Sequence, residues 1–296
     1  IAHRRDSQKE NLDTGVLGVL RIGTAGIPHS AKPRTSEGGL KRLAELGLTC
    51  MELEFVRSVQ MGAKTAAKVG QVARELDIGL TVHAPYYVNL NSAEPEKIAA
   101  SKERILKAAR IGAVAGARSV TFHAAFYHED DPEVVYERVR DGVWEMRRIL
   151  DGEGNSIRLS PETTGSLSQF GTLEEIVRLS EEIPGVGPCI DFSHLFARSI
   201  GEFNTYEQFA SALQLVRDKL GDEALQAMHI HLSGIAYGPK GERNHVLLEE
   251  TELDYRAVLR ALADFGVGGN LICESPVLED DALILQEYYN DLHQNR

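Results

Sequence analysis

The chain has 296 residues, of which 43% are hydrophobic, and its formal net charge is −12. This length suits one large α/β domain with a substantial core. The acidic balance counts against a nucleic-acid partner, because such proteins are usually basic, although a site for several divalent cations also needs excess carboxylates. The three cysteines are odd in number and lack paired spacing, which favours a reducing, cytoplasmic location.

No apolar run approaches the ~20 residues that a bilayer-spanning helix needs, so no membrane association is expected. Residues 1–15 are polar and lack the apolar segment of a secretory signal. We predict that they form a disordered extension and that residues 16–296 form a single domain. No feature of the sequence demands more than a monomer.

A short apolar run, a loop and an amphipathic segment recur about every 35 residues. The predicted strands are 17–24, 49–55, 78–84, 118–124, 157–162, 187–192, 227–233 and 270–275. The predicted helices are 37–46, 61–76, 95–116, 132–151, 173–182, 206–219, 253–265 and 278–292. Long loops are expected after the first, third and seventh strands, the last at 234–252. Strands that alternate with helices in this way predict an α/β fold, a single-domain (β/α)8 TIM barrel.

In such a barrel the active site lies at the C-terminal ends of the strands. The third to eighth strands all present His, Asp or Glu there, and two more such residues lie in the loop after the seventh strand. The candidate metal ligands are His83, His123, Glu162, Asp191, His194, His231, Glu242, His245 and Glu274. Imidazole and carboxylate are ligands that zinc prefers, and nine of them exceed the needs of one ion. We therefore predict a cluster of two or three divalent ions.

Any one of these residues alone is also explained as an ordinary hydrogen-bonded polar side chain. The joint occurrence at one height of the barrel carries the prediction, because burying so many ionisable groups is costly without a counter-charge. His229 lies two residues before His231 and deeper in the barrel, so it is left out of the ligand set.

Seven short motifs around these residues resemble the endonuclease IV family of apurinic/apyrimidinic endonucleases, which are xylose-isomerase-like barrels. They are HAPYYVNL (83–90), TFHAA (121–125), PETTG (161–165), CIDFSHLFA (189–197), HLSG (231–234), GERNH (241–245) and CESP (273–276). The likeness covers about residues 78–280 and is weaker before them.

The resemblance implies three Zn²⁺ ions, with Mn²⁺ as an alternative at one position. In this reading His83 and His123 hold the first ion, and Glu162 bridges it to a second that Asp191, His231 and Glu274 complete. His194 and His245 hold the third with one more carboxylate. The family pattern of Asp, one residue and His would place that Asp at position 243, where this chain has Arg243. Glu242, one residue out of register, is the candidate replacement.

The resemblance also implies an activity. Family members are zinc-dependent endonucleases of base excision repair, which hydrolyse the phosphodiester 5′ to abasic sites by a metal-bound hydroxide. Glu162 would be the catalytic carboxylate, and the partner would be double-stranded DNA with abasic or 3′-blocked lesions. The candidate DNA-contacting residues are Tyr86, Arg57, Lys32, Arg34, Arg198 and Arg243. Each of them also fits ordinary loop packing or a solvated surface.

Two other functions stay open from the sequence. A sugar isomerase or epimerase of the same barrel group needs one metal ion, for which Glu162, Asp191, His231 and Glu274 would suffice. The acidic charge favours this reading, whereas the four remaining histidines have no necessary role in it. A barrel that binds metal without catalysis is the third hypothesis.

Overall fold

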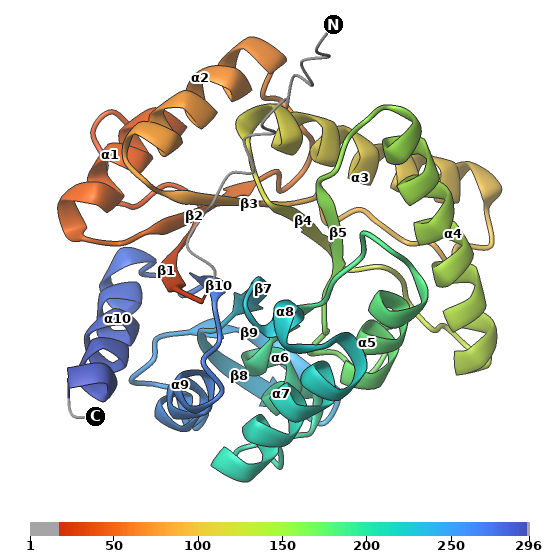
Figure 1. Cartoon of the computed structure of the whole chain (residues 1–296). Helices are drawn as coiled ribbons and strands as arrows, with labels where there is room; N and C mark the ends of the chain where they lie inside the picture. Colours follow the sequence, from red (N-terminus) through yellow and green to blue (C-terminus); the bar gives the residue numbers. More distant parts are fainter. Residues whose placement is uncertain (1–17, 295–296) are drawn as a thin grey trace, which may run out of the picture.

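The computed structural model describes residues 18–294, so the predicted extension at 1–15 lies outside the described residues. Eight parallel strands form a barrel with helices around its outside (Figure 1). These strands are β1 (Leu20–Ala25), β2 (Cys50–Glu54), β3 (Gly79–His83), β4 (Ser119–Phe122), β5 (Arg158–Pro161), β6 (Cys189–Asp191), β7 (Met228–His231) and β10 (Gly269–Cys273). The prediction of a (β/α)8 TIM barrel is confirmed.

The strands follow the order β5-β4-β3-β2-β1-β10-β7-β6. The seam between β5 and β6 closes through two parallel bridges, Leu159 with Val186 and Glu162 with Cys189. Close approach of strands is visible at Gly23 in β1, where a Cβ atom would lie 1.7 Å from the carbonyl oxygen of Cys50. Glycine at this position therefore lets the backbones of β1 and β2 meet.

Eight helices correspond to the predicted ones. They are α1 (Ser36–Leu46), α2 (Ala63–Glu75), α3 (Pro95–Ala115), α4 (Pro132–Gly152), α5 (Leu173–Glu182), α7 (Tyr206–Leu220), α9 (Tyr255–Asp264) and α10 (Glu279–Gln294). A capping box between Thr172 and Glu175 begins α5, and Gly116 ends α3 with a φ of 77°. Local chemistry thus sets the helix ends that bring each following strand back into the barrel.

The long loop expected at 234–252 contains secondary structure that the sequence did not predict. β8 (Gly234–Gly238) and β9 (Gly241–Val246) form an antiparallel hairpin there, beside α6 (Phe192–Arg198). The hairpin sequence is short, polar and glycine-rich, so it carries no clear alternation. Two short helices, α6 and α8 (Asp222–Leu225), were also not predicted, because they are too short to show helical periodicity.

Within residues 18–294, no helix has both the length and the apolar character needed to cross a bilayer. All three cysteines are buried free thiols.

Candidate metal centre

A cavity of about 570 Å³ lies at the C-terminal ends of the barrel strands. No Lys or Arg is among the described residues that line it. Its ionisable lining residues are Glu54, His83, Tyr86, His123, His194, Glu242, His245 and Glu274. Glu162, Asp191 and His231 lie beneath them and are at most 1% exposed. The structure therefore brings all nine predicted ligands to one end of the barrel.

Glu162, at the end of β5, lies at the centre of this cluster. Its Oε2 atom is 3.4 Å from Nε2 of both His83 and His123. Its Oε1 atom is 3.2 Å from Nδ1 of both His194 and His231. Because each oxygen faces a different pair of imidazoles, the carboxylate has the geometry to bridge two neighbouring cation sites.

The nine side chains fall into three groups, in each of which one ligand atom from every member lies within 4.8 Å of the others. The groups are His83, His123 and Glu162; Glu162, Asp191, His231 and Glu274; and His194, Glu242 and His245. Glu162 belongs to two of them. Three adjoining groups of three or four ligands match the coordination that divalent ions of the zinc type require.

The Nδ1 atoms of three histidines lie beside backbone carbonyl oxygens. Nδ1 of His83 lies 2.7 Å from the Ala84 oxygen, and Nδ1 of His245 lies 3.0 Å from the Glu274 oxygen. Nδ1 of His194 lies 2.9 Å from the Thr163 oxygen. A carbonyl accepts a hydrogen bond, so a proton on Nδ1 of His83 and His245 leaves their Nε2 atoms toward the cluster, whereas Nδ1 of His194 also faces Glu162 Oε1 at 3.2 Å. For His83 and His245 this is the tautomer that a metal ligand with a free Nε2 atom needs.

Asp191 and His194 are positioned by the start of α6. Asp191 is the N-cap of this helix, and its Oδ1 atom accepts a hydrogen bond from the His194 backbone nitrogen at 2.8 Å. The spacing of three residues therefore places both side chains at the same turn. The other oxygen, Oδ2, is buried without a hydrogen-bond partner among the described residues. An orphaned carboxylate oxygen in a cluster without basic side chains fits a divalent cation.

The pKa shifts of His83 and Glu162 also indicate that the cluster favours bound positive charge. Burial alone would lower the pKa of His83, but the Glu162 and Glu54 carboxylates outweigh it and raise this pKa to about 10. Burial likewise opposes charge on Glu162, yet the surrounding histidines hold its pKa well below the usual range. The carboxylates thus retain their charge and draw either protons onto the imidazoles or cations into the cluster.

Glu52 on β2 was not predicted from the sequence, although it is fully buried. Its Oε1 atom lies 2.9 Å from Nε2 of His231, and its Oε2 atom lies 2.8 Å from Nε2 of His229. With Nε2 of His231 facing Glu52, Nδ1 faces Glu162. His229 also contacts Ser119, whose Oγ atom lies 3.0 Å from Nδ1. Glu52 therefore orients His231, a predicted ligand whose ring has no hydrogen bond with a backbone carbonyl among the described residues.

Glu54, two residues further along β2, was also missed. It lines the cavity, and its Oε1 atom is buried without a hydrogen-bond partner among the described residues. Burial is the main cause that raises the pKa of Glu54 to about 8. The signal that could have revealed both residues is two glutamates on one face of the apolar run CMELEF.

A β-bulge explains how Glu242 reaches the third ligand group. Ala236 pairs with Asn244 and Tyr237 pairs with Glu242, so Arg243 is the extra, unpaired residue. In a regular strand Glu242 and His245 would point to opposite faces, and one inserted residue brings them to the same face. Oε2 of Glu242 lies 3.3 Å from His194 Nε2, and Oε1 lies 3.8 Å from His245 Nε2.

Gly165, the last residue of the PETTG motif, provides the space for Glu242. A Cβ atom at Gly165 would lie 2.7 Å from Glu242 Oε2 and 3.0 Å from His194 Cδ2. The Gly165 oxygen accepts a hydrogen bond from the Glu242 backbone nitrogen at 2.9 Å. The loop after β5 and the hairpin are therefore locked together beside the third group.

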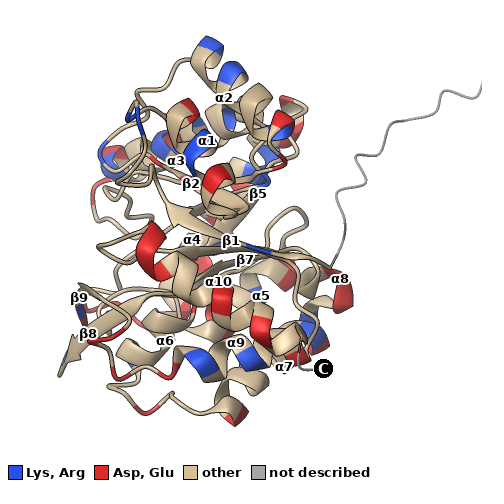
Figure 2. Cartoon of the chain, turned by 90° about the vertical axis from the view of Figure 1, so that its left-hand side faces the viewer, with Lys and Arg blue, Asp and Glu red and all other residues tan. Residues whose placement is uncertain are grey.

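The predicted DNA-contacting residues do not form one surface. Tyr86 is 54% exposed at the cavity mouth, with its ring centroid 5.3 Å from that of His83. Arg34 lines an adjoining hollow that also contains Glu54. Lys32 is exposed in the loop after β1. Lys and Arg are frequent on the side formed by α1, α2 and α3, next to these loops (Figure 2).

The other three predicted DNA-contacting residues do not line the metal-site cavity. Arg57 lines a separate hollow of about 270 Å³ with Arg104 and Lys107. Arg243 is exposed at the bulge of β9. Nη1 of Arg198 donates hydrogen bonds to the Ser166 and Gln169 carbonyl oxygens at 2.6 and 3.0 Å, so this guanidinium is committed to the loop after β5.

The sequence profile of the xylose isomerase-like TIM barrel family matches residues 40–290. The chain belongs to this family. An uncharacterized protein of Methanocaldococcus jannaschii is 43% identical over 93% of this chain and 98% of its own length. A probable endonuclease 4 of Halorhodospira halophila is 27% identical over 82% of both chains.

Two solved structures share the fold with equal TM-scores of 0.69. Endonuclease IV from Thermus thermophilus is 19% identical and matches 93% of this chain and 100% of its own. A D-tagatose 3-epimerase-like protein is 17% identical and matches 92% of this chain and 99% of its own. At such identities the structural likenesses show the fold alone. The predicted relationship to endonuclease IV proteins is confirmed at the level of the family.

Proposed function

We propose that this protein is a metal-dependent endonuclease that hydrolyses the DNA phosphodiester 5′ to abasic sites. We further propose that it holds three divalent ions, zinc foremost, with Mn²⁺ accepted at one position. The observation that carries the proposal is the set of three adjoining ligand groups, two of which share Glu162. A hydrolase acting on a phosphodiester uses such neighbouring cations to bind and neutralise the phosphate.

Each group has a role in this proposal. His83, His123 and Glu162 would hold one ion; Glu162, Asp191, His231 and Glu274 a second; and His194, Glu242 and His245 a third. Bound divalent ions supply a Lewis acid for the phosphate and lower the pKa of water, so that a nucleophile is present near neutral pH. The protein sets the spacing between the ions through Glu162 and orients the imidazoles through backbone carbonyls and Glu52.

The cavity mouth offers one aromatic contact suited to damaged DNA. Tyr86 is exposed beside His83, where an aromatic ring can enter the gap left by a missing base. Unstacking costs least where pairing is already lost, so an abasic site is the easiest position to deform. Arg34 and Arg243, in the β1 loop and the hairpin, could contact phosphates and position the duplex without reading its sequence.

A sugar epimerase is the alternative, because a single ion held by Glu162, Asp191, His231 and Glu274 would serve it and the fold is shared. The further ligands favour the endonuclease. His83 and His245 each place Nδ1 beside a backbone carbonyl and Nε2 toward the cluster, and Glu242 reaches its group through a bulge. A single-ion enzyme has no use for this arrangement.

The test is elemental analysis of the purified full chain combined with incision of a labelled duplex that carries one abasic analogue. We expect about three ions per chain and one nick on the 5′ side of the abasic site that leaves a 3′ hydroxyl. Chelation should abolish the nick, and added zinc should restore it. One ion per chain, with epimerisation of a ketose and no incision, would overturn the proposal.

A further inference from the structure

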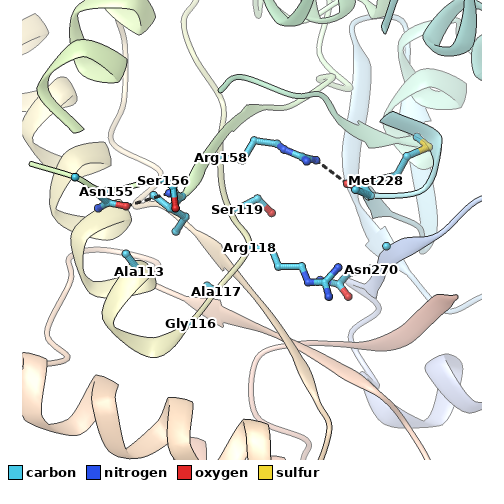
Figure 3. A pocket seen from close by; sticks show the side chains of 14 residues that line it. Ala113, Gly116, Ala117, Arg118, Ser119, Asn155, Ser156, Arg158, Met228 and Asn270 are labelled. Atoms are coloured by element: carbon cyan, nitrogen blue, oxygen red, sulfur yellow. Dashed lines mark hydrogen bonds between the residues drawn. The ribbon is translucent and has the colours of Figure 1, made fainter. Parts of the chain in front are cut away.

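A second cavity, of about 540 Å³, lies at the opposite end of the barrel from the metal ligands. Its walls come from the N-terminal ends of β4, β5, β7 and β10 and from the connections that precede them (Figure 3). Its volume is within the range of small-molecule sites, which are about 300–1,000 Å³. None of the predicted metal ligands lines it.

Two arginines give this cavity a positive character. Arg118 immediately precedes β4 and Arg158 is the first residue of β5, and both side chains extend toward Met228 and Asn270 (Figure 3). Nη1 of Arg158 donates a hydrogen bond to the Ala227 oxygen at 2.6 Å. Within residues 18–294, neither arginine forms an ion pair with a carboxylate. Burial, followed by the neighbouring Arg118, lowers the pKa of Arg158.

A nearby arginine shows that the barrel end does not exclude pairing. Arg21 on β1 forms an ion pair with Asp77, with 2.9 Å between Nη2 and Oδ1. The cavity arginines have no such carboxylate among the described residues, although the chain contains 44 acidic residues. Arg118 is exposed and Arg158 is half-buried, so an anion beside them would offset the cost of burying the Arg158 guanidinium without a carboxylate partner.

Neutral polar groups complete the cavity. The Oδ1 atom of Asn155 accepts a hydrogen bond from the Ile157 backbone nitrogen at 3.0 Å, which leaves its amide nitrogen available as a donor. Asn270 is 2% exposed, and its Oδ1 atom has no hydrogen-bond partner among the described residues. Ser156 adds a hydroxyl group to the wall. These groups resemble the few placed polar contacts that orient a small ligand.

We propose that this cavity is a binding site for a small phosphorylated molecule, whose phosphate is held by Arg118 and Arg158. Guanidinium groups present two parallel N–H donors that match phosphate oxygens. The cavity is larger than a phosphate ion, so it also accommodates an attached sugar or nucleoside. This site does not depend on the proposed endonuclease activity, because it shares no residue with the metal centre.

The test is calorimetric titration of the metal-loaded full chain with adenosine 5′-monophosphate, inorganic phosphate and adenosine. We expect one nucleotide to bind per chain and adenosine not to bind. Loss of charge-assisted hydrogen bonds in an R118Q/R158Q variant should weaken nucleotide binding at least about tenfold. R148Q is the matched control, because Arg148 is an exposed arginine on α4 and lies outside the cavity.

Two results would overturn the proposal. The first is no binding of nucleotide or phosphate. The second is equal affinity in the wild type and R118Q/R158Q, which would assign binding to another part of the protein. If R118Q/R158Q fails to fold, the nucleotide affinity of R118K is measured instead. Lysine keeps the charge but loses the paired donors of the guanidinium group, so unchanged affinity would contradict the proposal.

Discussion

The two ends of the barrel have opposite electrostatic character. At the C-terminal end, carboxylates and histidines surround a cavity whose described lining contains no Lys or Arg. At the N-terminal end, two arginines share a cavity without a carboxylate partner among the described residues. Each end therefore lacks its counter-charge within the described chain. The difference teaches that buried charged side chains without partners indicate the charge of a ligand before its identity is known.

A column of buried polar groups runs between the two ends. Ser119, which lines the N-terminal cavity, contacts His229, and Glu52 lies between His229 and His231. The ends are thus chemically distinct yet joined through the barrel interior. Experiments can therefore test the proposed divalent-cation site at one end and the proposed phosphate site at the other end independently.

The largest effect should follow removal of metal. Stripping the ions should abolish abasic-site incision and lower the melting temperature by on the order of 10 °C, because ions bound only by the folded state stabilise it. Nucleotide binding at the opposite end should persist. The measurements are incision assays, thermal melts and calorimetry before and after chelation. Loss of both functions together would break the comparison.

This effect should depend on pH with a defined sign. The pKa of His83 is raised from 6.5 to about 10 without a bound cation, so its contribution to the free energy of unfolding is full below pH 6.5 and is lost toward pH 10. The metal-free chain should therefore become less stable over this range, and the melting shift on adding zinc should grow. A shift that shrinks from pH 6.5 to 9 would contradict this account.

Glu162→Gln should cost incision activity on the order of 10³-fold while the fold remains, since the substitution removes the carboxylate shared by two ligand groups. Metal content should fall at the same time. Glu137→Gln, the same change at an exposed position of α4, should leave activity unaltered. Retained incision in E162Q would remove Glu162 from its assigned role.

Glu52→Gln should weaken metal binding by about 10- to 100-fold, the usual effect of losing a partner behind a ligand histidine. The physical reason is that His231 loses the carboxylate at its Nε2 atom. Competition with a chelator of known affinity measures this change directly, again with E137Q for reference. If affinity and stoichiometry stay the same, Glu52 serves only the packing of the barrel.

The smallest effect should come from the third ligand group. Glu242→Gln should reduce the metal content from about three to about two ions, whereas Arg243→Gln should leave it unchanged, because the bulge turns Glu242 toward His194 and leaves Arg243 exposed. Elemental analysis of both variants measures the difference. If R243Q lost an ion and E242Q did not, position 243 would face the metal as in the family pattern.

The sequence was sufficient to predict the barrel and the gathering of the candidate ligands at its C-terminal end. Strand–helix alternation determines the fold class, and parallel strands must end at one rim, so residues such as His83, Asp191 and Glu274 had to lie at the same end of the barrel. The IDxxH motif also had a local cause, since Asp191 caps the helix that carries His194. These conclusions depend on hydrophobic periodicity and on spacing between nearby residues, both of which can be read directly from the sequence.

Only the tertiary structure decided the rest. Glu52 became meaningful when closure of the barrel placed it against His229 and His231, which lie about 180 residues away in the chain. A bulge that no spacing rule predicts places Glu242 beside His194, and four segments that meet only at the barrel end form the arginine cavity. The physical reason is common to all three: the direction of a side chain and its partners across the barrel depend on register and closure, which are long-range properties.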